Sequence, residues 1–239
     1  MHQGTPMSDK HLSSQFDSEL TGVSTRVMKM GGLVESQIRT AVQALSQFSV
    51  ELADQVTSTE SQVNAMEIEI DHDLSSIIAR RQPTARDLRL LIAISKTTAN
   101  LERAGDEADK IARMVKSIIE SGAARTLPSS ELRVAADMAS GLLRKSLDAF
   151  ARLDANIALT ILKEDDAIDR EFDGFVRKLI TYMMEDPRTI SPSLNLLFLA
   201  KAVERIGDHA KNIAEFTIYV VKGADVRHTP MDQIESVVR

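Results

Sequence analysis

The chain has 239 residues, of which 43% are hydrophobic and 27% charged, and these proportions exclude a largely disordered protein. It contains no cysteine, which excludes disulfide bonds, cysteine-bound zinc and thiol nucleophiles. A formal net charge of -6 and an aromatic content of only 4% argue against nucleic acid as a partner.

The sequence predicts six helices, separated by short stretches rich in glycine, proline and serine. The long segments between these stretches repeat apolar residues every three or four positions, which is the helical period. Thr84 is expected to cap the third helix and Gly223 to end the sixth, while Gly31 and Gly32 should weaken or bend the first. In chain order, the predicted helices cover roughly residues 15–48, 51–81, 84–121, 129–153, 156–184 and 191–223.

The two ends of the chain are predicted to be tails, over residues 1–14 and 224–239. No run of about 18 apolar residues is present, so no segment is expected to span a bilayer. The first residues also lack the apolar region of a signal peptide. We therefore expect a cytoplasmic protein.

The chain contains an internal repeat. The segment Glu-Arg-x-Gly-Asp occurs at Glu102–Asp106 and again at Glu204–Asp208, and the match continues along both helices. Upstream of the proline turns, the offset between the two copies changes by a few residues. Such an insertion lies in a surface turn, where it costs little stability. The sequence therefore predicts an all-α fold of two tandem, sequence-related three-helix bundles, over residues 15–122 and 128–223.

Each copy of the repeated segment combines two helix faces. Gly105 and Gly207 lie on an apolar stripe, where the missing side chain lets a neighbouring helix approach closely. Beside that stripe, acidic or amide residues recur at helical spacing. They are Glu102, Asp106 and Asp109 in the third helix, Glu204, Asp208 and Asn212 or Glu215 in the sixth, Glu60, Asn64, Glu67 and Asp71 in the second, and Asp165, Asp169 and Asp173 in the fifth.

These acidic rows indicate a metal site. Short connections make the second and third helices, and the fifth and sixth, antiparallel neighbours, so their rows are expected to face one another. Several carboxylates without a thiolate are the ligands that hard cations use. The alternative interpretation is that each stripe is simply a solvated, charged helix face.

Two groups of basic residues are candidate partner-binding residues. Arg103 and Arg205 each follow a stripe glutamate by one position, about 100° around the helix, so they should point toward another element. Arg80, Arg81, Arg86 and Arg89 flank the turn between the second and third helices. These four either pair with nearby carboxylates or form a docking surface.

Known catalytic motifs are absent, because the sequence contains no phosphate-binding loop, dinucleotide loop, nucleophile elbow or His-Glu-x-x-His. A ferritin-like metalloenzyme would need Glu-x-x-His pairs, and none is present. We therefore predict that the protein is not an enzyme and has no organic cofactor. A carboxylate-bridged metalloenzyme and a metal-free helical scaffold remain the alternatives.

The repeated segments resemble the PhoU family. Residues 79–89, Ala-Arg-Arg-Gln-Pro-Thr-Ala-Arg-Asp-Leu-Arg, are similar to a characteristic turn of that family, and residues 204–215 to its most recognisable stretch. The resemblance implies a cytoplasmic regulator of phosphate uptake that represses the phosphate-starvation response. It also implies a homodimer, and as partners the ATPase subunit of the phosphate ABC transporter and a membrane sensor histidine kinase, so that the protein reaches the membrane only through them.

The resemblance further implies multinuclear iron or zinc clusters on Glu/Asp-x-x-x-Asp pairs. By position, these pairs are Glu102 with Asp106, Glu204 with Asp208, and Asp165 with Asp169. The first repeat has Glu60 with Asn64 instead of the last pair, so we expect its site to bind metal more weakly or to use Glu67 and Asp71. Lys211 occupies the position that matches Asp109, so the two sites need not be equivalent.

Overall fold

The computed structural model describes residues 14–122 and 130–239, and every regular element in these residues is helical. Most of the predicted N-terminal tail and the connection at 123–129 lie outside the described residues. No helix in the described ranges is both long enough and apolar enough to cross a bilayer. The elements are α1 (Ser14–Gln47), α2 (Val50–Arg81), α3 (Ala85–Glu120), α4 (Ser130–Arg152), α5 (Ala155–Glu185), the 3-10 turn η1 (Pro187–Thr189), α6 (Ile190–Lys222) and α7 (Met231–Val238).

Local capping chemistry explains where several helices begin and end. Ser49 caps α2, because its hydroxyl accepts a hydrogen bond from the Leu52 amide at 3.2 Å. Asp154 caps α5 in the same way. Thr84 occupies the predicted cap position of α3 but makes no side-chain capping bond. Gly223 ends α6 as predicted, with a left-handed φ of 74° that glycine adopts without strain.

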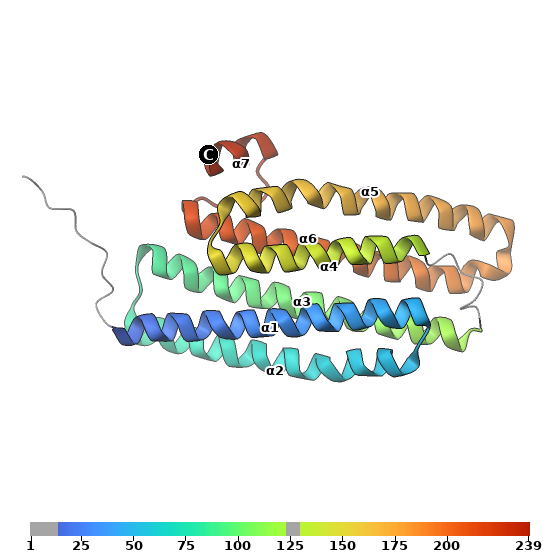
Figure 1. Ribbon diagram of the computed structural model, residues 1–239, viewed down its shortest axis with the longest axis horizontal. Coiled ribbons are helices and arrows are strands. Elements are labelled where there is room, and N and C mark those ends of the chain that lie inside the picture. The colour runs from blue at the N-terminus through green and yellow to red at the C-terminus, as the bar shows by residue number, and fades with distance from the viewer. Residues whose placement is uncertain (1–13, 123–129) are drawn as a thin grey trace, which may run out of the picture.

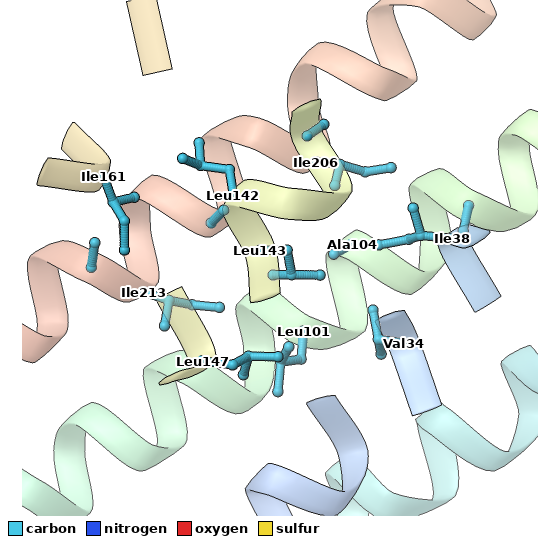
Figure 2. Close-up of a cluster of buried hydrophobic side chains, with 14 of the residues drawn as sticks. Val34, Ile38, Leu101, Ala104, Leu142, Leu143, Leu147, Ile161, Ile206 and Ile213 are labelled. Atoms are coloured by element: carbon cyan, nitrogen blue, oxygen red, sulfur yellow. The ribbon is translucent and has the colours of Figure 1, made fainter. Parts of the chain in front are cut away.

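The helices form two antiparallel three-helix bundles, α1–α3 and α4–α6, which lie side by side along their lengths (Figure 1). α3 packs against α6, and α1 against α4, so the two bundles share one apolar core. Figure 2 shows this shared core, with side chains of α1 and α3 facing side chains of α4 and α6, while Ile161 of α5 lies farther from α1 and α3. The predicted fold class is therefore confirmed, and the two repeats are related by an approximate two-fold axis.

α1 is helical throughout, including Gly31 and Gly32, where the sequence predicted a weak point. A Cβ at Gly31 would lie 2.8 Å from both terminal methyl carbons of Leu147 on α4, whereas a Cβ at Gly32 would meet nothing within 4 Å. Gly31 therefore allows α1 and α4 to approach closely. The burial gained at this contact compensates for the low helix propensity of glycine.

The predicted C-terminal tail is wrong over its last part, because residues Met231–Val238 form α7. Ile234 and Val238, one turn apart, are buried, and α7 packs against α5 and α6. The Glu235 carboxylate also accepts an ion pair from Lys163 of α5 at 2.6 Å. Tertiary burial of one apolar face therefore stabilises a helix that is too short to be stable alone.

Candidate metal centre and the surfaces beside it

Carboxylates of α2 and α3 converge in the first bundle, as the acidic rows predicted. One carboxylate oxygen from each of Glu60, Glu102 and Asp106 lies within 4.8 Å of the other two. Glu60 and Glu102 are half-buried and Asp106 is exposed, so the group opens to solvent on one side. We call these three residues, together with Glu67 and Asp109, the first acidic cluster.

The charges of this cluster oppose one another. Burial, and then the charges of Asp106, Glu67 and Glu60, raise the pKa of Glu102 to about 7. Burial also raises the pKa of Glu67 and, in spite of a hydrogen bond from Gln37, that of Glu60. Ionising all the carboxylates at neutral pH is therefore unfavourable unless a cation is present.

Three buried oxygens near this cluster have no hydrogen-bond donor in the described part of the chain. They are Oε1 of Gln37, Oε1 of Glu60 and Oδ1 of Asp109. The other amide atom of Gln37, Nε2, donates to Glu60 Oε2 at 2.8 Å and fixes that carboxylate. Asp109 is buried, and its Oδ2 lies 3.1 Å from Arg113. Buried acceptors without donors are costly, and a cation would satisfy them.

Gly105 makes room for these oxygens. A Cβ at this position would lie 3.0 Å from Gln37 Oε1 and 3.2 Å from Glu60 Oε2. The sequence predicted that Gly105 lies on a packing stripe, and it does, but the groups that approach it include two polar side chains from α1 and α2. The glycine of Glu-Arg-x-Gly-Asp thus serves both the packing and the oxygen-lined space.

The oxygen-only composition of the first acidic cluster fits a hard cation. Glu60, Glu102 and Asp106 would be the ligands; Gln37 would orient Glu60 through its hydrogen bond, and Glu67 and Asp109 act on the group through their charges. Asn64 and Asp71 are exposed on α2 and lie outside the group of three carboxylates. Asp71 acts on this region only by raising the pKa of Glu67.

Two of the corresponding carboxylates of the second bundle already pair with lysines of the protein itself. We call Asp165, Asp169, Glu204 and Asp208 the second acidic cluster. Lys211 donates from Nζ to Oδ2 of the buried Asp165 at 2.8 Å. Lys201 Nζ lies 2.6 Å from a carboxylate oxygen of Glu204. Burial, and then Glu204, Asp165 and Asp169, nevertheless raise the pKa of Asp208 to about 6.

The two acidic clusters therefore differ in their charge, in line with the sequence, which has Lys211 in the second repeat at the position of Asp109 in the first. Within the described residues, three acidic side chains converge closely enough to share an ion only in the first bundle. The geometry consequently favours the first acidic cluster, opposite to the weaker binding expected from Asn64. The physical reason is that Lys211 supplies a positive charge at the place of Asp109, whereas Asn64 is exposed and takes no part.

Asn212, a predicted ligand, lies on another face of α6. Its amide donates to Asn100 Oδ1 of α3 at 3.0 Å, so it joins the interface between the bundles and not the second acidic cluster. His209 Nδ1 is 3.2 Å from the same oxygen, and His209 is buried. Burial, and then the charges of Arg103 and Arg205, lower the pKa of His209 to about 4.

The predicted partner-binding arginines have different environments. Arg80 and Arg81 form ion pairs with Glu19 of α1, at 3.3 and 2.9 Å. Of the two predicted roles, these two arginines therefore show pairing with a nearby carboxylate. Arg205 pairs with Glu107 of α3 at 3.0 Å. Three arginines complete the set: Arg86 and Arg103 are exposed, and Arg89 lies against the end of α6 at Gly223.

Comparisons with known proteins agree with the fold and the repeat. The PhoU domain family matches residues 27–115 and 132–217. A phosphate-specific transport system accessory protein PhoU homolog from Burkholderia sp is 48% identical over 95% of this chain and 97% of its own. The phosphate-specific transport system accessory protein PhoU of Escherichia coli (strain K12) is 46% identical over 96% of this chain and 95% of its own.

Solved structures give the same result. The crystal structure of PhoU from Pseudomonas aeruginosa superposes with a TM-score of 0.85 at 47% identity, over 88% of this chain and 100% of that chain. The phosphate transport system regulatory protein PhoU from Streptococcus pneumoniae gives 0.82 at 27% identity, over 89% of this chain and 99% of that chain. With two matched domains, full-length relatives and the same helical architecture, this chain belongs to the PhoU family.

Proposed function

We propose that this protein is a cytoplasmic, non-enzymatic regulator of phosphate uptake that represses the phosphate-starvation response when phosphate is plentiful. The observation that supports this most directly is the similarity, over 95% of the chain, to proteins named as accessory to the phosphate-specific transport system. The proposed role is an adaptor between the ATPase subunit of the phosphate transporter and a sensor histidine kinase. The protein acts as a homodimer and reaches the membrane only through these partners.

The exposed surface supports a role in protein binding. Phe198 on α6 is 56% exposed and Met184 near the end of α5 is 78% exposed, so both offer apolar surface to a partner. Arg86 adds an exposed charge at the turn between α2 and α3. Aromatic residues, methionine and arginine are the residue types enriched in protein interfaces.

A cation on the first acidic cluster belongs to this proposal. Glu60 comes from α2, and Glu102 and Asp106 from α3, so their shared ion would bind two helices together and remove the repulsion between their charges. Iron, zinc, manganese and magnesium are the candidate ions. Gln37 and Gly105 hold the oxygens apart and in position, so the protein shapes the site before the ion arrives.

A genetic experiment tests the regulatory role. Deleting the gene should switch on phosphate-starvation genes in medium rich in phosphate, because the repressing component is lost. Wild-type protein should restore repression, and it should co-purify with the transporter ATPase and the kinase. Normal repression in the deletion strain would contradict the proposal.

A matched pair of variants tests whether the first acidic cluster contributes. The double variant Glu60→Gln, Glu102→Gln should restore repression poorly, because the ligand charges are gone. Glu164→Gln, on the exposed side of α5, removes a carboxylate elsewhere and should restore repression fully. Turnover of a substrate by the purified protein that Glu102→Gln abolishes would instead favour the metalloenzyme alternative.

A further inference from the structure

The two-fold relation between the repeats pairs residues across the interface of α3 and α6. These helices run antiparallel and pack against each other (Figure 1), so residues in the same position of the two repeats meet different groups on the opposite helix. Arg205 of α6 meets Glu107 of α3 at 3.0 Å. The equivalent pair in the other half is Arg103 of α3 with His209 of α6, because Glu107 and His209 occupy the same position of the repeat.

This exchange of a carboxylate for a histidine leaves a positive charge without a partner. Arg103 makes no ion pair within 4.0 Å among the described residues, and it acts on His209 only through its charge. Lys96, two turns earlier on α3, likewise has no ion pair in the described chain. Lys96, Asn100 and Arg103 are spaced i, i+4 and i+7, so they line one face of α3.

A cleft of about 730 Å³ opens over this face, between α3, α6 and the segment that leads into α7. Five lysine and arginine side chains line it together with His209 and His228, against two carboxylates, Asp208 and Glu215. Three of the five cations are already paired: Lys211 with Asp165, Arg205 with Glu107 and Arg227 with Asp225. Lys96 and Arg103 are the two that remain available to a ligand.

Asn100 organises the wall of the cleft and fixes the hydrogen-bonding state of His209. Its amide nitrogen donates to the Lys96 carbonyl oxygen at 2.8 Å, so its Oδ1 is the atom that faces α6. That oxygen accepts from Asn212 at 3.0 Å and lies 3.2 Å from His209 Nδ1, which must therefore carry the proton. His209 Nε2 is left as an acceptor, without a partner in the described residues.

We propose that this cleft binds the phosphate group of a small anion, with Lys96 and Arg103 as its cationic contacts and His209 Nε2 as an acceptor for a P–OH group. Guanidinium and ammonium groups are the usual phosphate contacts, and the cleft has the volume for inorganic phosphate or for a nucleotide. At neutral pH inorganic phosphate carries a hydroxyl that can donate to Nε2, whereas sulfate carries none. The charge of Arg103 also reaches Glu67 and Glu102 of the first acidic cluster, where it opposes the rise of their pKa, but none of the three proposed phosphate contacts belongs to that cluster. The inference does not depend on the proposed regulatory role.

Calorimetric titration of the full-length protein tests this inference, with potassium phosphate, ADP and potassium sulfate as three separate probes at equal ionic strength. We expect saturable binding of phosphate or ADP, and the tighter of the two identifies the source of the phosphate group. Sulfate should bind more weakly than phosphate. The absence of saturable heat with both phosphate and ADP, or equal binding of sulfate and phosphate, would overturn the proposal.

Two variants separate this cleft from other anion sites. Arg103→Ala should weaken binding about tenfold or more, because it removes one charge-assisted contact. Arg144→Ala, on the exposed face of α4, removes the same charge and should leave binding unchanged. Phosphate binding that survives Arg103→Ala but disappears in Glu102→Gln would place the anion on a metal at the acidic cluster and contradict the proposal.

A third variant restores the symmetry of the repeat. His209→Glu places a carboxylate opposite Arg103, as Glu107 stands opposite Arg205. It should weaken phosphate binding at least as much as Arg103→Ala, while circular dichroism confirms that the variant is folded. A folded His209→Glu protein with wild-type phosphate affinity would show that the unpaired charge of Arg103 is not what binds the anion.

Discussion

Lys211 Nζ donates to Asp165 Oδ2 at 2.8 Å, at the place where the first repeat sets Asp109 beside Glu60. The two repeats share a fold, but the second repeat has an ion pair between Lys211 and Asp165 where the first has two like charges, Asp109 and Glu60, that repel each other. The second acidic cluster is thus partly neutralised by the protein itself, whereas in the described residues no lysine or arginine forms an ion pair with Glu60, Glu102 or Asp106 of the first. This difference is the basis of the metal proposal.

Removing Lys211 should destabilise the protein, because it leaves the buried Asp165 without its cation. The lysine side chain is 37% exposed, so solvent reduces the loss, and we expect Lys211→Ala to lower the free energy of unfolding by about 1–2 kcal/mol. Urea denaturation measures this value. Lys145→Ala breaks the exposed pair with Glu164 and should change stability by less than about 0.5 kcal/mol. Equal effects of the two variants would show that burial of Asp165 is unimportant.

The stability of the metal-free protein should depend on the ionisation of Glu102. Its ordinary pKa is 4.5, and burial with the charges of Asp106, Glu67 and Glu60 raises it to about 7, while Arg103 opposes the shift. Below pH 4.5 the carboxyl is protonated in both states and contributes no penalty. As the pH rises from 4.5 to 7 the unfolded chain ionises first, so the folded state loses stability, and above pH 7 the loss is complete.

Thermal unfolding in chelator, compared between wild type and Glu102→Gln, checks this dependence. After allowance for solvent screening, the variant should be more stable by about 1–2 kcal/mol above pH 7 and should lose that advantage near pH 4.5. A difference that does not vary with pH would contradict the assigned cause. Saturating divalent metal should reverse the order at neutral pH, because only the wild type keeps the full ligand set.

Two adjacent glycines of α1 should respond in opposite ways to substitution. Gly31→Val inserts a branched side chain where even a Cβ would lie 2.8 Å from Leu147, so we expect a loss of about 1–3 kcal/mol at the contact between the bundles. Gly32→Ala meets nothing within 4 Å and should gain about 0.5–1 kcal/mol from helix propensity. Chemical denaturation of both variants checks the pair. A stabilising Gly31→Val would mean that α1 and α4 do not pack as closely as the structure shows.

Much of the fold could be predicted from the sequence because its signals are local. Apolar periodicity, Gly223 and the proline turns place the ends of six helices within a few residues of the observed bounds. α7 was missed because a short helix has little propensity signal and depends on burial of Ile234 and Val238 against distant helices. The one available signal was the spacing of these two apolar residues by a single helical turn after Pro230.

The candidate site could be predicted in part. Helical spacing placed Glu102 and Asp106 on one face, and the repeat suggested a second copy. Gln37 was missed because it belongs to α1, and which α1 residue faces the acidic row depends on how the three helices pack. Its position among the apolar residues of α1 was the only available signal. Asn212 was wrongly assigned to the acidic row. It follows Lys211, the residue that matches Asp109, by one position, and one position turns a helical side chain by 100°, here toward α3.

Metal content per chain tests the central claim most directly, measured by elemental analysis of protein purified without chelator or nickel resin. Wild type should contain iron, zinc or manganese, Glu102→Gln should lose it, and Glu204→Gln should retain it, because the second acidic cluster already holds Lys211. Metal-free wild-type protein whose melting temperature does not change on adding metal would contradict the account. So would equal loss of metal in both variants.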